Sequence, residues 1–287
     1  MRILAVTNIK GGVGKTTTAV NLAYLTARAG RATLLWDLDP QGAATFTLHA
    51  APGAHASARK LVHGKRELPE LVVPSGHPGL DLLPADFSYR NFDLHLAERK
   101  HPTERLLRMS AALGERYEYL VLDCPPGISL LSENVLRAAD AVIVPVVPSP
   151  LSVRMLATLR EFIAREGWTG LALLPFFSMV DRRRALHLEL ITEARARFAE
   201  LLATEIPYWS EIERMSVRRA PLPAYSPDGA AARLYEALLG EVLSRMGAEA
   251  LPPRVAAPVA SAEPMAATAA EAPAWPAGPA APDGAVH

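Results

Sequence analysis

The chain has 287 residues, of which half are hydrophobic and 21% are charged, and its formal net charge is zero. This balance is typical of a folded globular protein and excludes a chain that is disordered over its whole length. A neutral chain has no overall attraction to nucleic acid or to an anionic membrane, so any such binding must come from a local patch. The single cysteine, Cys124, excludes an internal disulfide and favours a reducing compartment, so we expect a cytoplasmic protein.

The sequence predicts neither export nor membrane insertion. Residues 1–7 form a short apolar run that passes straight into glycines, unlike the apolar region and cleavage site of a signal peptide. No stretch approaches the roughly 20 apolar residues that span a bilayer, because even the run at residues 138–147 is interrupted by Asp140 and Pro145.

Short apolar, β-branched runs alternate with longer amphipathic segments along most of the chain. This alternation predicts an α/β fold with a mostly parallel, doubly wound sheet and helices on both faces. Strands are expected at residues 3–7, 32–36, 80–83, 119–122, 141–147 and 171–177. Helices are expected at residues 15–29, 102–113, 129–137, 151–166, 184–202 and 229–246.

Two segments have weaker patterning. Residues 50–79 are rich in Ala, His, Gly and Pro, and we expect a short helix with loops there. From residue 247 onward the composition changes to Ala and Pro with few charges. We therefore expect one folded domain over residues 1–246 and a disordered tail over residues 247–287.

A glycine-rich segment, KGGVGKTT at residues 10–17, connects the first expected strand to the first expected helix. Its backbone N–H groups can turn inward around phosphate oxygens, as in a P-loop. In a P-loop Lys15 neutralises the β- and γ-phosphates of ATP, the Thr16 hydroxyl binds Mg²⁺ and Thr17 donates to the α-phosphate. The expected cofactors are therefore ATP and Mg²⁺, and the expected nucleotide-binding residues of the loop are Gly11, Gly12, Val13, Gly14, Lys15, Thr16 and Thr17.

Aspartates follow two other expected strands. Asp37 and Asp39, in WDLDPQG at residues 36–42, point the same way at two-residue spacing, where a doubly wound sheet presents its ligands. An alternative for one of the two is to cap the next helix. Asp123 ends an apolar strand and precedes CPPG, which is the arrangement of a Walker B motif, so we expect it to hold Mg²⁺ through water.

Together these motifs resemble, in their order, the ParA family of partition and positioning ATPases, in which the P-loop carries an additional lysine at the position of Lys10. The resemblance covers residues 1–246, as a P-loop ATPase domain of the short form without an N-terminal DNA-binding domain. It implies that Lys10 reaches across a nucleotide-sandwich dimer to the partner's phosphates, where a cation stabilises phosphoryl transfer. A solvated lysine is the alternative for this position.

The resemblance also implies roles for the aspartates. Asp39 would position the attacking water near Mg²⁺. The implied catalytic residues are then Lys10, Lys15 and Asp39, and the implied metal residues are Thr16, Asp39 and Asp123.

Three further segments are similar to the family. FSMVDR at residues 177–182 and EIP at residues 205–207 resemble segments near the adenine, which implies contacts from Met179, Asp181 and Pro207. The turn at residues 125–127, Pro-Pro-Gly, resembles one that changes shape with the nucleotide state. At residues 147–150 the chain reads VPSP where the family often has Gln and Glu, which places it outside the main chromosomal partition branch.

Arginines cluster in two places against the neutral background, and such clusters suit phosphate backbones. The resemblance implies non-specific binding of double-stranded DNA in this C-terminal region, and hence association with the nucleoid. Solvated helix faces, paired with nearby glutamates, are the alternative. The candidate DNA-binding residues are Arg182, Arg183, Arg184, Arg214, Arg218 and Arg219.

The histidines before the tail lie singly and without metal-ligand spacing, so we expect them at surface or loop positions. They are His49, His55, His63, His77, His95, His101 and His187.

The implied function is an ATPase switch with weak intrinsic activity. It would form an ATP-dependent homodimer, bind DNA, position a plasmid, chromosome or protein assembly, and hydrolyse ATP when a ParB-like or adaptor protein stimulates it. A MinD-like membrane-associated ATPase is one alternative, although residues 251–287 lack the basic amphipathic helix it needs. An ATP-dependent amidoligase or carboxylase relative is another, although those relatives lack the DLDPQ signature of residues 37–41.

Overall fold

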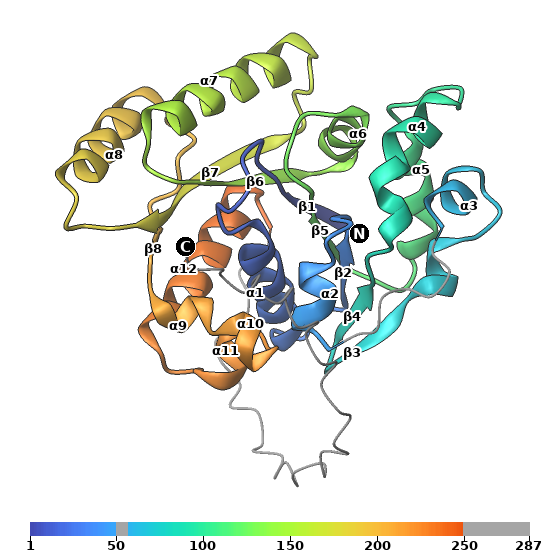
Figure 1. The fold of residues 1–287 in the computed structure, drawn as a ribbon, viewed down its shortest axis with the longest axis horizontal. Coiled ribbons are helices and arrows are strands. Elements are labelled where there is room, and N and C mark those ends of the chain that lie inside the picture. The colour runs from blue at the N-terminus through green and yellow to red at the C-terminus, as the bar shows by residue number, and fades with distance from the viewer. Residues whose placement is uncertain (50–56, 249–287) are drawn as a thin grey trace, which may run out of the picture. The chain divides into compact units, whose positions relative to one another are not determined.

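The computed structural model describes residues 1–49 and 57–248. They form an eight-stranded sheet in the order β3-β4-β2-β5-β1-β6-β7-β8 (Figure 1). Neighbouring strands are parallel except β3 and β4, which are antiparallel. The strands are β1 (Arg2–Val6), β2 (Thr33–Asp37), β3 (Val73–His77), β4 (Leu80–Leu83), β5 (Tyr119–Asp123), β6 (Ala141–Val146), β7 (Ala172–Val180) and β8 (Glu205–Pro207).

Helices connect the strands and cover both faces of the sheet. The α-helices are α1 (Lys15–Arg28), α2 (Ala43–Thr47), α3 (Ala58–Val62), α4 (Phe92–Ala97), α5 (Arg105–Ser110), α6 (Leu130–Ala138), α7 (Pro150–Arg165), α8 (Ala185–Arg197), α9 (Ser210–Glu213), α10 (Met215–Arg218), α11 (Leu222–Tyr225) and α12 (Ala230–Arg245). Short 3₁₀ helices are η1 (Leu68–Leu71), η2 (Phe87–Asn91) and η3 (Ala111–Leu113).

The sheet separates two hydrophobic cores, because successive side chains of a strand point to opposite faces. Leu4 of β1 and Leu35 of β2 pack with α1, α2 and α12 in one core. Ile3 and Trp36 of the same strands pack with helices α3 to α8 in the other (Figure 1). Strands buried on both faces have no polar alternation, which is why the central runs read as continuously apolar. The predicted α/β fold with a doubly wound sheet is confirmed.

Local sequence sets the starts of the helices that flank the site. α6 begins after Ser129, whose hydroxyl accepts from the Ser132 amide while the Ser132 hydroxyl accepts from the Ser129 amide, so that the two form a capping box. α7 begins after Ser149, which caps the Ser152 amide, and Pro150 occupies its first turn, where a missing N–H costs nothing.

Several expected bounds differ from the structure. The helix expected at residues 184–202 ends at Arg197, and the one expected at 102–113 is divided between α5 and η3. Residues 57–79 contain the short α3 but also β3, an edge strand that was not expected. β3 includes Pro74 and Gly76, residues that disfavour strands, and it forms because an antiparallel partner, β4, is only a tight turn away. The three-residue β8 was also missed as a strand.

The expected C-terminal tail and the expected surface histidines can be compared with the structure only in part. Most of the tail expected at residues 247–287 lies outside the described residues, as does His55. His187 was expected at the surface but is only 4% exposed, because it lies on the inner side of α8. Within residues 1–49 and 57–248, none of the helices combines the length and the hydrophobicity that a membrane span requires.

Candidate active site

The loop at residues 10–17 joins the end of β1 to the start of α1, as predicted. Asn8 fixes its beginning: the side-chain amide donates to the Pro145 carbonyl at 2.7 Å and its Oδ1 accepts from the Lys10 amide at 3.0 Å. Gly14 fixes its end at φ 90°, and a Cβ there would lie 3.1 Å from the Ser178 hydroxyl of β7. Only glycine fits both the backbone conformation and this close approach.

Lys15 lies inside the loop, with 7% of its surface exposed. Its Nζ donates to the backbone carbonyl of Lys10 at 3.0 Å. Burial lowers the pKa of the Lys15 ammonium, and the charges of Asp123 and Asp39 oppose that shift. Lys15 begins α1 after β1, Asp123 ends β5 and Asp39 follows β2, so one cation and two anions lie at the same edge of the sheet.

Asp123 is the most unusual residue of the site. It ends β5, pairs in register with Val6 of β1 and with Asp37 of β2, and is fully buried. Neither of its carboxylate oxygens has a hydrogen bond of ordinary geometry among the described residues, although the Thr16 hydroxyl is near enough to influence it. Burial, followed by the charge of Asp37, raises its pKa well above the usual range, while Thr16 and Lys15 lower it.

A buried carboxylate without a partner is costly unless a cation compensates it. Oxygen ligands of this kind suit Mg²⁺, which commonly keeps several waters and takes one or two carboxylates with substrate phosphates. Asp123 beside Thr16 therefore fits the predicted metal position.

Asp37 and Asp39 differ in role although they are two residues apart. Asp37 is fully buried and accepts from the Thr45 amide at 2.8 Å and the Thr45 hydroxyl at 2.7 Å, so it holds the start of α2. Burial raises its pKa to about 6, and these hydrogen bonds lower it. Asp39 is half-buried and accepts from the Gln41 amide at 3.0 Å. Asp37 is thus the helix-capping member of the pair, and Asp39 is the one left to face a ligand.

The turn that follows Asp123 is exposed. Gly127 has φ 117°, a conformation that favours glycine, and Ile128 beside it is 64% exposed. The Gly127 carbonyl accepts from the Ser132 hydroxyl of α6 at 3.2 Å. The turn is therefore tied to the first turn of α6, and a change in its shape would reach that helix.

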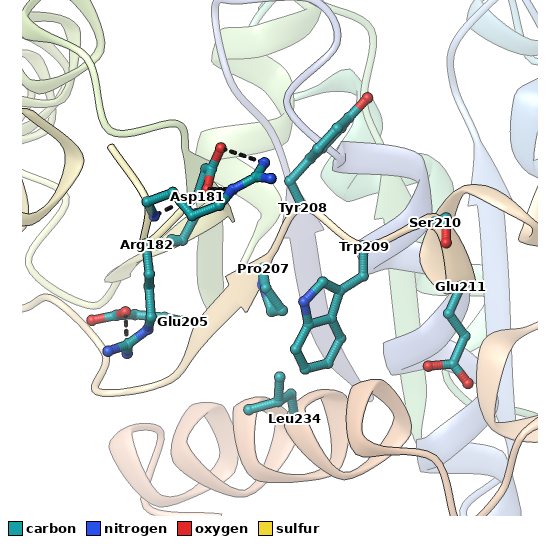
Figure 2. Close-up of a pocket in the computed structure, with 11 residues that line it drawn as sticks. Asp181, Arg182, Glu205, Pro207, Tyr208, Trp209, Ser210, Glu211 and Leu234 are labelled. Atoms are coloured by element: carbon teal, nitrogen blue, oxygen red, sulfur yellow. Dashed lines mark hydrogen bonds and ion pairs between the residues drawn. The ribbon is translucent and has the colours of Figure 1, made fainter. Parts of the chain in front are cut away.

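A pocket of about 780 Å³ opens where β7 and β8 end (Figure 2). Asp181 and Pro207, both expected near the adenine, line it, together with Tyr208, Trp209 and Leu234. Trp209 lies between Pro207 and Leu234 in Figure 2. The aromatic pair was missed from the sequence, although two aromatics directly after the EIP segment were a usable signal.

Met179, the third residue expected near the adenine, precedes this pocket at φ 55°. That conformation is uncommon for a residue with a side chain and marks local strain, which occurs often at ligand sites. The pairing of β7 with β8 is irregular here, between Phe177 and Val180. Met179 lies next to the pocket in sequence and is not one of its lining residues.

The first arginine cluster is largely occupied by ion pairs. Arg183 binds the Asp181 carboxylate through two nitrogens at 2.9 and 3.0 Å, which lowers the pKa of Asp181 to about 2 (Figure 2). Arg182 lies 2.8 Å from Glu205. Both arginines line the pocket. Arg184 is exposed at the start of α8.

The second cluster lies on α9 and α10. Arg219 donates to the Phe46 carbonyl at 2.9 Å and stacks its guanidinium over the Phe46 ring, with 4.5 Å to the ring centroid. Arg214 and Arg218 are exposed, and within the described part of the chain neither forms an ion pair. The alternative of pairing with Glu211 and Glu213 is therefore not realised as direct ion pairs in this structure.

Comparison with known proteins identifies the family. A family model described as an AAA domain matches residues 1–166. The chromosome partitioning protein ParA of Caulobacter vibrioides is 31% identical over 261 residues, which cover 85% of this chain and 95% of that protein. The chain belongs to the ParA family of P-loop ATPases.

Solved structures of similar fold carry nucleotides. The ATP complex of a variant of Cyanothece McdA has a TM-score of 0.74 at 21% identity and covers 88% of this ParA-family chain and 99% of its own. Cobyrinic acid a,c-diamide synthase of Mycobacterium smegmatis, with bound ADP and magnesium, has a TM-score of 0.65 at 29% identity, covering 79% and 94%. The fold of this ParA-family chain therefore occurs in proteins that bind adenine nucleotides.

Proposed function

We propose that this ParA-family chain binds ATP with Mg²⁺ in the loop at residues 10–17 and hydrolyses it slowly. The carrying observation is the buried carboxylate of Asp123, which has no hydrogen-bond partner among the described residues and lies close enough to Lys15 and Thr16 for each to lower its pKa. A magnesium ion would compensate that charge, and Lys15 would exchange its bond to the Lys10 carbonyl for phosphate oxygens. Asp39 would hold the attacking water.

The pocket beyond β7 and β8 would take the adenine. Its size of about 780 Å³ suits a small ligand, and Pro207, Trp209 and Leu234 offer apolar surface to a base. Asp181 and Arg183, which form an ion pair and both line the pocket, would provide polar groups.

ATP would then join two chains. Lys10 is the first residue of the loop and is half-buried. In an extended conformation its side chain would reach the phosphates bound to a second subunit. A cation there would stabilise charge in the transition state. The dimer would bind DNA without sequence preference through Arg214 and Arg218, and a partner protein would set the rate of hydrolysis and so release the cargo.

The amidoligase alternative has one observation in its favour, the likeness to the cobyrinic acid a,c-diamide synthase of M. smegmatis. The ParA of C. vibrioides is more similar to this chain in identity and in coverage than the synthase is, which favours a partition ATPase. Product analysis separates the two, because an amidoligase consumes ATP only when a carboxylic acid and an amide donor are supplied.

Phosphate release from Mg-ATP tests the proposal. Lys15→Ala should reduce turnover by about two orders of magnitude or more, as loss of a charge-stabilising group typically does. Lys65→Ala, which removes an exposed lysine outside the site, should leave turnover unchanged. Undiminished turnover in Lys15→Ala would reject the site.

A further inference from the structure

His63, His95 and Glu98 come together where α3 packs against α4, although 35 residues separate His63 from Glu98. His63 ends α3, His95 lies within α4 and Glu98 ends α4. One ligand atom from each residue lies within 4.8 Å of the other two. Sequence spacing did not reveal this cluster, because the fold joins residues that lie far apart in the chain.

The two oxygens of Glu98 each face a different histidine. Oε2 lies 3.0 Å from Nε2 of His63, and Oε1 lies 3.9 Å from Nδ1 of His95. The two rings are splayed at 73°, with 6.4 Å between their centroids. The contact with His63 is a hydrogen bond, whereas the one with His95 is too long to be one.

An ion pair between His63 and Glu98 does not account for the position of His95. Its Nδ1 is buried and has no hydrogen-bond partner among the described residues. Buried polar atoms nearly always have a partner, and an exception calls for a cause such as an ion. A His63–Glu98 pair alone would not require a ring nitrogen of His95 to point at the same carboxylate.

We propose that His63, His95 and Glu98 bind a zinc ion, with water as the fourth ligand. Two imidazole nitrogens and a carboxylate oxygen are a ligand set that zinc takes in tetrahedral geometry, with bonds of about 2.0–2.2 Å. Such bonds place ligand atoms about 3.3 Å apart. The contact of 3.0 Å between His63 and Glu98 is already close to that value, whereas ligand atoms up to 4.8 Å apart would need to approach by up to about 1.5 Å. Glu98 is half exposed, with 52% of its side chain accessible, and is free to make that movement.

The ligand set selects the kind of ion. Glu98 also lines a pocket of about 530 Å³ with Arg99, Lys100, Arg105 and other basic residues. These charges repel all divalent cations alike, so the ligands decide which ion fits: Mg²⁺ and Ca²⁺ are held chiefly by oxygen atoms, of which the cluster offers only the Glu98 carboxylate. Imidazole ligands suit zinc, so the two histidines favour zinc over these hard cations.

A metal at this position would tie α3 to α4 and, through α4, reach the nucleotide site. Asp93 of α4 accepts from the Leu131 amide at 2.7 Å, which holds the first turn of α6. That turn follows directly on the Gly127 turn after Asp123. The inference stands on α3 and α4 alone and does not depend on the proposed ATPase function.

Zinc titration of the untagged, chelator-treated full chain, without nucleotide, tests the site by calorimetry and thermal unfolding. We expect saturable binding of one ion per chain and a rise in the melting temperature that Mg²⁺ does not reproduce. His95→Asn and His63→Asn should each weaken zinc binding by at least roughly tenfold, the lower limit for losing even an outer-sphere group. Co²⁺ substitution should give the absorption spectrum of a tetrahedral site in wild type and not in His95→Asn.

The control is His49→Asn, an exposed histidine outside the cluster whose positive φ asparagine also tolerates. It should bind zinc as wild type does. If His95→Asn fails to fold, Glu98→Gln at its half-exposed position still tests zinc binding, which it should weaken. Absence of saturable binding in wild type, or binding that the three cluster variants leave unchanged, would overturn the proposal.

Discussion

The ammonium of Lys10 donates a hydrogen bond to the hydroxyl of Ser152 at 3.3 Å, across 142 residues of the chain. Ser152 is 4% exposed and is itself contacted by Ser149, the residue that caps α7. The residue proposed to act on a second subunit is therefore held by its own chain. Ser152 lies just after the VPSP segment at which the sequence departs from the family pattern.

Releasing Lys10 should favour dimerisation. Ser152→Ala removes a hydrogen bond to a charged group, worth about 1.5–3 kcal/mol, so we expect ATP-dependent dimerisation to tighten by roughly 10- to 150-fold. Lys10→Ala should bind ATP but stay monomeric. Sedimentation velocity with a non-hydrolysable ATP analogue measures both, with Ser216→Ala, an exposed serine, as the control. A Lys10→Ala variant that dimerises normally would refute the role of Lys10.

Neutralising Asp123 should stabilise the nucleotide-free chain while removing its response to magnesium. Asp123→Asn eliminates a buried charge that has no partner among the described residues, so we expect a gain of about 1–2 kcal/mol in unfolding free energy. Asp37→Asn is the matched comparison and should destabilise, because Asp37 accepts two hydrogen bonds from Thr45. Urea unfolding with and without Mg-ATP distinguishes the two variants. Equal destabilisation by both would show that Asp123 is compensated within the chain.

The advantage of Asp123→Asn should depend on pH. Burial raises the pKa of Asp123 well above its usual range, and that of Asp37 to about 6. A carboxyl with a folded-state pKa above its unfolded value binds more protons when folded, so its contribution to stability is lost as pH rises through that window. The stability difference between Asp123→Asn and wild type should therefore shrink as pH falls from 7 toward about 4. Unfolding curves at stepped pH would contradict this if the difference grew on acidification.

DNA binding should rest on the two exposed arginines without ion pairs among the described residues. Arg214→Ala with Arg218→Ala should weaken binding to arbitrary duplex DNA and reduce the slope of log affinity against log salt by about 2, since each phosphate contact contributes about 0.9. Arg165→Ala serves as the control, because its side chain is 72% exposed on α7 yet lies outside both clusters. Fluorescence anisotropy at several salt concentrations measures the slope. An unchanged slope would leave these arginines as solvated helix residues.

Trp209 should contribute to nucleotide affinity through the base. Its side chain lines the pocket, and base–aromatic contacts are worth about 1–3 kcal/mol by alanine substitution, so Trp209→Ala should weaken binding about 5- to 100-fold. The loss should be the same for ATP and ADP, because both share the adenine. Trp209→Phe should keep most of the affinity. A loss confined to ATP would place Trp209 near the γ-phosphate instead.

The features that could be predicted from the sequence have local signals, and those that could not depend on contacts between distant segments. The central strands and the P-loop were predictable because burial on both faces and the glycine pattern are local signals. β3 was not, since Pro74 and Gly76 disfavour a strand and only its antiparallel partner β4 makes one. The same holds within the site: Lys15, Asp39 and Asp123 follow from motifs. The contact between Lys10 and Ser152, and that between Gly14 and Ser178, depend on strand order, which no short segment encodes.

Cys124, the single cysteine of the chain, is buried at the end of β5 with 3% of its surface exposed, and burial raises the pKa of its thiol well above the usual range. A thiol of this kind reacts slowly with alkylating dyes, because the thiolate is the reactive form. A cysteine introduced at an exposed position can therefore be labelled selectively without first replacing the native one. Fluorophores placed this way on two populations of the chain would report subunit association directly, with the residues around Asp123 left intact.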